Sequence, residues 1–406
     1  MSRIRKIEIS HFRSIQHLDW VPSAGINCLV GHGDSGKSTL VDAIDLCLGA
    51  RRNAQFADTD FYKLDVEQPI HIAVTIGDLN DALKNLDTYG LYLRGYNVET
   101  KALLPEPDAG AETVLTVQLT VESDLDPIWS LYSERAVAQN QTRNLNWVDR
   151  VNLAPTRLGA SADYNLSWRR GSILNRVSDE RADASAALAN AAREARKTFG
   201  DNAKDQVSET LAIVKDSAEK IGISVGDVTA MLDTHSVSLS GGTISLHDGD
   251  GVPLRGLGLG STRLLIAELQ RRAADQTSII LVDEIEHGLE PHRINRLIAS
   301  LGAKEADPPL QVFMTTHSPV ALRELSTSQL YVLRRMANRH EVQNIGSHDN
   351  MQSTVRACPE AFLASSVIVC EGASEIGLTR GLDFYRVEKG QPSIMALGVA
   401  LADGLV

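Results

Sequence analysis

Hydrophobic and polar positions alternate in several stretches of the chain, which is the pattern of a half-buried β-strand. The N-terminal stretch IRKIEISHFRSI alternates in this way, and INCLV after it is a short apolar run with β character. Alternation returns in PIHIAVTIGDL and ETVLTVQLTVES, which we expect to be antiparallel strands flanking a polar loop near residues 105–112. The pattern therefore predicts a sheet in the first third of the chain.

A helical period begins directly after Lys37, where Leu40, Val41, Ile44 and Leu48 recur at helical spacing. Residues 181–235 are rich in Ala, Glu, Lys and Arg and poor in aromatic residues, a composition that forms helices. We interpret this stretch as a helical insertion, an arm or dimerisation element, between the two halves of one domain, residues 1–180 and 236–355. Beyond the insertion, Gly241-Gly242 between alternating segments predicts a hairpin.

Strand patterns resume toward the C-terminus. SIILVDEIEHG and QVFMTTHSP are apolar runs that end in polar residues, and STSQLYVLRRM with HEVQNIG predicts a closing hairpin. VIVCEG predicts a further buried strand, and ASEIGLTRGLDFY after it carries apolar residues at helical spacing. GQPSIMALGVALADG then resembles one more strand.

Composition narrows the class of protein. The 406 residues are 43% hydrophobic, without an apolar run long enough for a membrane span or a signal peptide, so we expect a globular, cytoplasmic protein. The four cysteines have no metal-binding spacing. The net charge of −12 argues against a surface covered in nucleic-acid contacts, although it leaves local basic stretches such as SWRRGSILNR and VLRRMANR, which are more often solvated faces.

The segment GHGDSGKST matches the phosphate-loop pattern G-x-x-x-x-G-K-[ST], and it joins a predicted strand to a predicted helix. Glycines let backbone N–H groups turn toward phosphates, Lys37 supplies a charge to the β and γ oxygens, and Ser38 can coordinate Mg²⁺. The sequence therefore predicts an ATP site with these residues: Gly31, Gly33, Asp34, Ser35, Gly36, Lys37, Ser38 and Thr39.

Two acids follow a second apolar strand, Asp283 and Glu284. At the carboxyl end of a strand in a doubly wound sheet, Asp283 would hold Mg²⁺ and Glu284 would polarise the attacking water. The alternative, that they only cap the next helix, explains one carboxylate better than an adjacent pair. His317 follows the next strand and is a candidate sensor of the γ-phosphate.

A glycine-rich turn before a helix, GLGLGSTR, lies between these elements. The order of phosphate loop, insertion, glycine-rich turn, Asp-Glu strand and histidine loop resembles the ABC-type ATPases of the SMC/RecF group, an α/β head with a mixed sheet. The resemblance implies that Arg13 lies near the nucleotide, and that Gly258, Gly260 and Ser261 contact the γ-phosphate bound by a second head, so that ATP joins a homodimer or larger homo-oligomer. Gly258 stands where the group has serine, and the glutamine of its Q-loop is either Gln55 or Gln68.

At the end of the chain, Glu371 ends a strand and Glu375 follows in the first turn of a helix. An SMC/RecF-type head followed by strand-EGxxE-helix resembles the OLD (overcoming lysogenisation defect) family of ATP-dependent endonucleases, which includes Gabija-type proteins. This resemblance implies that Glu371, as a catalytic residue, and Glu375 hold Mg²⁺ or Mn²⁺ in a Toprim domain that cuts double-stranded DNA. Residues 360–406 would be its incomplete start, because no D-x-D follows. We therefore expect the chain to be a fragment of a longer protein, and endonuclease activity only of that longer protein.

Three functions follow as hypotheses. The first is the ATPase head of an ATP-gated DNA endonuclease in antiphage or anti-plasmid defence, with a helicase-like partner implied by the family alone. The second is a RecF-like DNA-repair ATPase without nuclease activity. The third is an ATP-dependent dimerising sensor or scaffold that controls a separate effector. In the last two, Glu371 and Glu375 are ordinary acids at a helix start.

Overall fold

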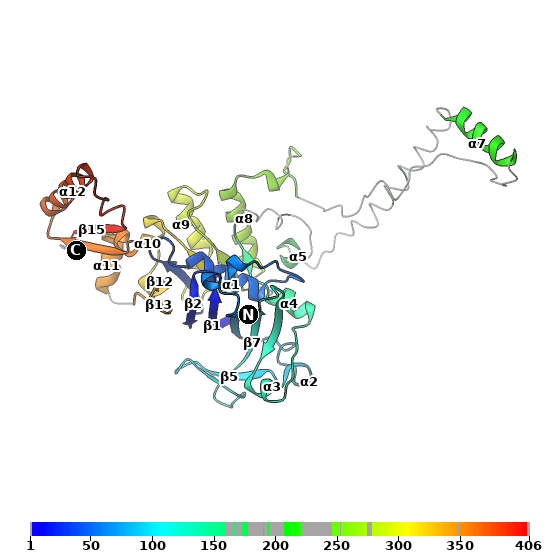
Figure 1. Cartoon of the computed structure of the whole chain (residues 1–406), viewed down its shortest axis with the longest axis horizontal. Coiled ribbons are helices and arrows are strands. Elements are labelled where there is room, and N and C mark those ends of the chain that lie inside the picture. The colour runs from blue at the N-terminus through cyan, green and yellow to red at the C-terminus, as the bar shows by residue number, and fades with distance from the viewer. Residues whose placement is uncertain are drawn as a thin grey trace. The chain divides into compact units, whose positions relative to one another are not determined.

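The computed structural model describes residues 2–159, 246–251, 253–273, 278–346 and 349–403, together with short stretches between residues 166 and 220. The chain forms two compact units, one of residues 1–164 and 256–406 and the other of residues 165–255. In the second unit the described helices are α5 (Leu174–Val177) and α7 (Ser208–Lys220), and α7 agrees with the helical composition there (Figure 1). The rest of the predicted insertion and the Gly241-Gly242 hairpin lie outside the described residues.

The first sheet is antiparallel. Among the described residues its strand order is β2-β1-β4-β7-β5-β6, and β8 also pairs with β7. Its strands are β1 (Arg3–Phe12), β2 (Ile15–Trp20), β4 (Ile70–Gly77), β5 (Leu93–Asn97), β6 (Ala102–Leu104), β7 (Glu112–Val121) and β8 (Pro127–Tyr132). The predicted pairing of the PIHIAVTIGDL and ETVLTVQLTVES segments is confirmed, since β4 and β7 are antiparallel neighbours.

Two details of this sheet differ from the expectation. The N-terminal stretch is two strands, because the chain turns at Arg13, whose φ of 47° lies in the left-handed region. The segment between β4 and β7 is also more than a polar loop, since it contains the short helix α2 (Leu86–Tyr89) with β5 and β6. Strands of three to five residues carry too little alternation to be recognised from the sequence.

The second sheet carries the predicted phosphate loop. Among the described residues its order is β13-β12-β3-β11-β10-β9, parallel except for the β12–β13 hairpin. The strands are β3 (Ile26–Val30), β9 (Thr156–Arg157), β10 (Ile279–Val282), β11 (Gln311–Thr315), β12 (Leu330–Arg335) and β13 (His340–Asn344). The closing hairpin and the mixed α/β fold expected from the sequence are both confirmed.

The two sheets share one core. Helix α1 (Lys37–Leu48) packs against strands of both sheets, and its apolar residues Leu40, Val41 and Ile44 are fully buried. Trp20 at the end of β2 makes edge-to-face contacts with Phe313 of β11 and Tyr331 of β12. Such contacts stabilise the fold beyond what the buried area of Trp20 contributes, because the positive edge of one aromatic ring attracts the negative face of the other.

The remaining helices cover this core or follow its strands. Their bounds are α3 (Glu134–Ala138), α4 (Trp147–Leu153), α8 (Leu259–Arg272), α9 (Pro291–Ser300), α10 (Pro319–Glu324), α11 (Asp349–Ala357) and α12 (Ala373–Glu388). None of the described helices is long and apolar enough to cross a membrane.

The C-terminal segment is a β-α-β unit. Strand β14 (Ser366–Cys370) runs into α12, and β15 (Val399–Asp403) returns parallel to β14. The predicted strand, helix and second strand are therefore present, but the prediction that the first strand is buried is wrong, because in β14 only Cys370 is buried. Apolar side chains of this unit stay exposed, among them Val369, Leu378 and Phe384. The described residues 360–403 contain no further strands, so a Toprim domain is not evident in them.

Candidate functional site

The phosphate loop joins β3 to α1 and needs glycine at two positions. Gly31 has a φ of 146°, and a Cβ there would lie 2.8 Å from the carbonyl oxygen of Leu333. Gly36 has a φ of 95° and directly precedes the first residue of α1. Both backbone conformations strain other residues. The loop is therefore shaped by the glycines of the motif before any ligand is present.

Lys37 is held inside this loop. Its Nζ donates to the carbonyl oxygens of Gly31 at 3.0 Å and His32 at 2.8 Å, and to the hydroxyl of the buried Ser35. Burial lowers the pKa of Lys37, although the carboxylates of Asp283 and Asp34 act in the opposite direction. The ammonium group is thus placed where the motif requires a positive charge for phosphate oxygens.

The other predicted loop residues differ in exposure. Gly33 and Asp34 are exposed at the tip, and Asp34 has a φ of 59°. Thr39 lies one residue beyond Ser38 in α1, and its hydroxyl is 3.3 Å from that of Ser14. Their contacts with a nucleotide stay predictions.

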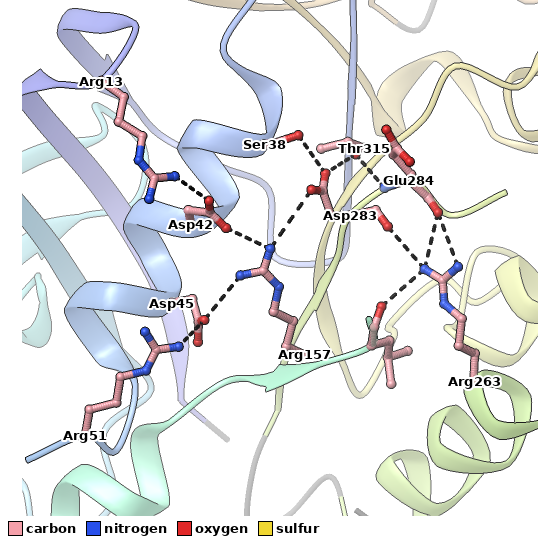
Figure 2. A network of polar contacts seen from close by, with 11 residues as sticks. Arg13, Ser38, Asp42, Asp45, Arg51, Arg157, Arg263, Asp283, Glu284 and Thr315 are labelled. Atoms are coloured by element: carbon pink, nitrogen blue, oxygen red, sulfur yellow. Dashed lines mark hydrogen bonds and ion pairs between the residues drawn. The ribbon is translucent and has the colours of Figure 1, made fainter. Parts of the chain in front are cut away.

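Ser38 in the first turn of α1 contacts Asp283 at the end of β10. The Ser38 hydroxyl donates to Asp283 Oδ1 at 3.0 Å, and Thr315 Oγ1 donates to the same oxygen at 2.7 Å (Figure 2). A hydroxyl beside a carboxylate is the oxygen donor set that Mg²⁺ takes when phosphates complete its shell. Among the described side chains, no group of three or more His, Cys, Asp or Glu could hold a metal by itself. The residues present fit a metal bound together with a nucleotide.

Glu284 and His317 reach the same edge from adjacent strands. The Glu284 carboxylate is exposed, while its backbone N–H donates to Thr315 Oγ1 at 2.8 Å and its φ is 48°. His317 is exposed as well, and its backbone N–H donates to Glu286 Oε1 at 2.7 Å. Glu286 also accepts from Thr316 Oγ1 at 2.7 Å, so it fixes the loop that carries His317. Sequence reasoning missed Glu286, although it is the third acid of the DEIE segment.

The glycine-rich turn begins α8. Gly258 is the exposed N-cap residue of this helix, and Ser261 accepts a hydrogen bond from Arg293 at 3.2 Å. Gly260 is buried, and a Cβ there would lie 2.7 Å from the carbonyl oxygen of Gly288. This close approach explains the glycine at 260 without a ligand. Contact of Gly258, Gly260 and Ser261 with a second head stays a prediction.

Arg263, the last residue of the GLGLGSTR segment, has a structural role that the sequence does not indicate. The structure buries it at 1% exposure, and its guanidinium donates to backbone carbonyls of the loop after β10 and of the β9 end. The acceptors are Asp283, Glu284, Ile285, His287 and Leu158. Burial lowers the pKa of Arg263, and the carboxylate of Glu286 leads the groups that oppose this. Arg263 thereby fixes α8 to the loop that presents Asp283 and Glu284.

Arg13 lies at the turn between β1 and β2 and faces α1. It donates to Asp42 Oδ2 at 2.6 Å (Figure 2). It also donates to Asp60 Oδ1 at 2.8 Å. Its contact with a nucleotide stays a prediction. Gln55 and Gln68, the two Q-loop candidates, are both exposed. Arg157, which sequence reasoning missed, lies beside Asp283, with its Nη2 4.0 Å from Asp283 Oδ2.

Glu371 and Glu375 occupy the positions predicted for them. Glu371 directly follows β14, and Glu375 lies in the first turn of α12. Both side chains are exposed. The geometry agrees equally with a metal site and with acids that favour a helix N-terminus, so their metal binding stays a prediction.

A buried histidine on β13 packs against the phosphate loop. His340 is 4% exposed, and neither ring nitrogen has a hydrogen-bond partner among the described residues. Its Cδ2 and Nε2 lie 3.5 Å from the position that a Cβ on Gly36 would occupy. Burial lowers the pKa of His340 below its ordinary value of 6.5, and Arg335 adds to the effect.

This burial predicts a pH dependence of stability. In the unfolded chain His340 takes up a proton as the pH falls through about 6.5, whereas the folded chain resists protonation, so acid favours unfolding. The urea midpoint of unfolding is measured at pH 7.5 and at pH 5.5. We expect the decrease between these two pH values to be larger for the wild type than for His340→Phe. His17→Gln, at an exposed histidine of β2, is the control and should fall like the wild type. An equal fall for His340→Phe and the wild type would contradict the prediction.

The comparison with solved structures finds Smc head domains and a RecF recombination mediator protein, each with a TM-score below 0.5. The "Smc head domain with an extended coiled coil bound to the C-terminal domain of ScpA derived from Pyrococcus furiosus" has a TM-score of 0.44 at 15% identity and covers 84% of this chain and 96% of its own. The "recombination mediator protein RecF-ATPrS in RecFOR pathway" has a TM-score of 0.40 at 10% identity and covers 84% of this chain and 98% of its own. The "SMC head domain from Thermotoga maritima" has a TM-score of 0.37 at 12% identity, covering 85% and 99%.

No curated protein matches the sequence. A family model does match, over residues 26–323, which include the phosphate loop, Asp283, Glu284 and His317. The chain therefore belongs to the family described as "AAA domain, putative AbiEii toxin, Type IV TA system".

Proposed function

We propose that this chain is a Mg²⁺-dependent ATPase head. The observation that carries the proposal is the contact between the Ser38 hydroxyl and Asp283, with Lys37 held in the same loop. One residue of the phosphate-loop motif and one from the end of β10, which β11 separates from β3 in the sheet, thus provide a pair of oxygen atoms for a metal beside a positive charge. Membership of an AAA-domain family supports the same activity.

Each residue has a definite part in this proposal. Backbone N–H groups of the loop and Lys37 bind the phosphates. Ser38 and Asp283 would hold Mg²⁺, which would neutralise charge on the phosphates. Glu284 accepts a proton from the attacking water, and His317 contacts the terminal phosphate from the loop fixed by Glu286.

Calorimetry with ATP and Mg²⁺ tests the proposal, followed by measurement of phosphate release. We expect the wild type to bind, and Lys37→Ala to bind about 100-fold more weakly, because two or more charged hydrogen bonds to phosphate are lost. Lys63→Ala, at an exposed lysine, is the control and should bind like the wild type. Absence of ATP binding to a folded wild type would refute the proposal.

A second candidate function is metal-dependent DNA cleavage in a homodimer or larger oligomer of heads. It is favoured by the β14-α12-β15 unit, in which Glu371 follows a strand and Glu375 begins the next helix. A role in defence draws support from the family's description, which names a toxin of a type IV system. The OLD-like assignment and a helicase-like partner belong to this candidate.

Nicking of supercoiled plasmid tests the second candidate. The product of the whole reading frame is incubated with Mg²⁺ or Mn²⁺, with and without ATP, beside its Glu371→Ala variant and the control Glu388→Ala at the other end of α12. Cleavage lost only in Glu371→Ala supports it. ATP-dependent dimerisation of that product without cleavage of the plasmid favours the RecF-like ATPase or the dimerising sensor instead.

A further inference from the structure

Arg157 reaches the candidate site from an edge strand of two residues. Strand β9 runs parallel to β10, with Thr156 opposite Ile280 and Arg157 opposite Leu281. Parallel strands end at the same edge of a sheet. Arg157 therefore lies at the same edge of the sheet as Asp283, which directly follows β10. In the sequence the two residues are 126 positions apart (283 − 157).

Three carboxylates face the Arg157 guanidinium (Figure 2). Nη2 lies 2.7 Å from Asp42 Oδ1 and 4.0 Å from Asp283 Oδ2, and Nη1 lies 3.4 Å from Asp45 Oδ2. Asp42 and Asp45 belong to α1, one and two turns after the predicted metal ligand Ser38. Arg157 thus touches both elements that would supply the metal ligands, the phosphate-loop helix and the end of β10.

The two oxygens of Asp283 have different partners. Oδ1 accepts from Ser38 and Thr315, whereas Oδ2 has Arg157 as its nearest cation among the described residues. A guanidinium and a divalent cation near one carboxylate repel each other, so the metal and Arg157 compete for Asp283. Asp42 and Asp45 already lie closer to the guanidinium than Asp283 does, so Arg157 keeps two acceptors when a metal takes Asp283.

We propose that Arg157 is a positioning residue that balances the charge of Asp283 before the metal binds and then moves fully to Asp42 and Asp45. The inference rests on the proposed ATPase function and deepens it. Through this exchange Arg157 sets the Mg²⁺ concentration that nucleotide binding requires. Arg13, in the turn between β1 and β2, donates to the other oxygen of Asp42. The exchange therefore involves a carboxylate that also contacts this turn.

The test is the Mg²⁺ concentration that half-saturates binding of a fluorescent ATP analogue, a readout independent of hydrolysis. Arg157→Gln removes the competing cation and should lower this concentration about tenfold. Arg157→Lys keeps the charge and should stay near the wild type. Asp42→Asn removes one of the two negative charges that draw Arg157 away from Asp283, so it should raise the Mg²⁺ requirement.

Arg51→Gln is the matched control. Arg51 also pairs with Asp45 Oδ2 and is 39% exposed, close to the 35% of Arg157, but it does not face Asp283. Its removal should leave the Mg²⁺ requirement unchanged. Equal shifts in Arg51→Gln and Arg157→Gln, or no shift in Arg157→Gln and Asp42→Asn, would overturn the inference. A wild type that binds the analogue shows that such a failure concerns Arg157 alone; one that does not bind overturns the ATPase proposal with it.

Discussion

Glu284→Gln is expected to slow ATP hydrolysis by about 10²- to 10³-fold while leaving ATP binding intact, because the amide keeps the size of the carboxylate but cannot accept a proton. The change should cause little strain, since the residue is exposed and its backbone is fixed by Thr315. Single-turnover phosphate release and ATP affinity, measured on the same preparation, separate the two steps.

Glu290→Gln provides the control for that variant. Glu290 is an exposed glutamate at the start of α9, paired with Arg293, and its substitution should not change the rate. If Glu284→Gln hydrolyses ATP at the wild-type rate, the general base is another group. A stable ATP-bound dimer of Glu284→Gln would support ATP as the link between two heads.

Arg263→Ala should destabilise the first unit by about 3 kcal/mol or more, because several buried carbonyls would lose their donor. The shortest of these hydrogen bonds runs to His287 at 2.7 Å, and others reach Leu158 and Asp283 at 3.2 Å. Lysine should replace Arg263 poorly, since a single ammonium group cannot reproduce the planar set of donors. Urea unfolding at neutral pH measures the change in free energy.

Arg293→Ala is the matched control for this second variant. Arg293 is 38% exposed on α9 and bonds to Ser261 and Glu290, so its loss should cost about 1 kcal/mol or less. Equal destabilisation by Arg263→Ala and Arg293→Ala would show that the carbonyl contacts of Arg263 contribute little.

The two central parts of the candidate site were predictable because each lies within a short continuous segment. The loop from Gly31 to Thr39 combines a strand, required glycines and a helix start within about ten positions, so local chemistry and local structure agree. Asp283 and Glu284 were recognisable for the same reason, as acids that end an apolar strand. The helix after Lys37 and the hairpin of β12 and β13 also followed from their own periodicity.

The roles of three further residues follow from contacts between distant segments, which no local sequence pattern indicates. These residues are Arg157, Arg263 and Glu286. A strand of two residues has no detectable period, so nothing marked Thr156 and Arg157 as the neighbour of β10. An arginine on an amphipathic helix is ordinarily exposed, and only the packing of α8 against the loop after β10 buries Arg263.

The sequence by itself determined the phosphate loop, the acids after β10 and the mixed α/β class, since these depend on residue type and spacing along one segment. The tertiary structure decided which charges meet. Arg13, Asp42, Arg157 and Asp283 come from four separate elements, and sheet pairing and helix packing bring them together (Figure 2). Electrostatic interactions depend on distance in space and not on separation along the chain, so this network became visible only in the folded protein.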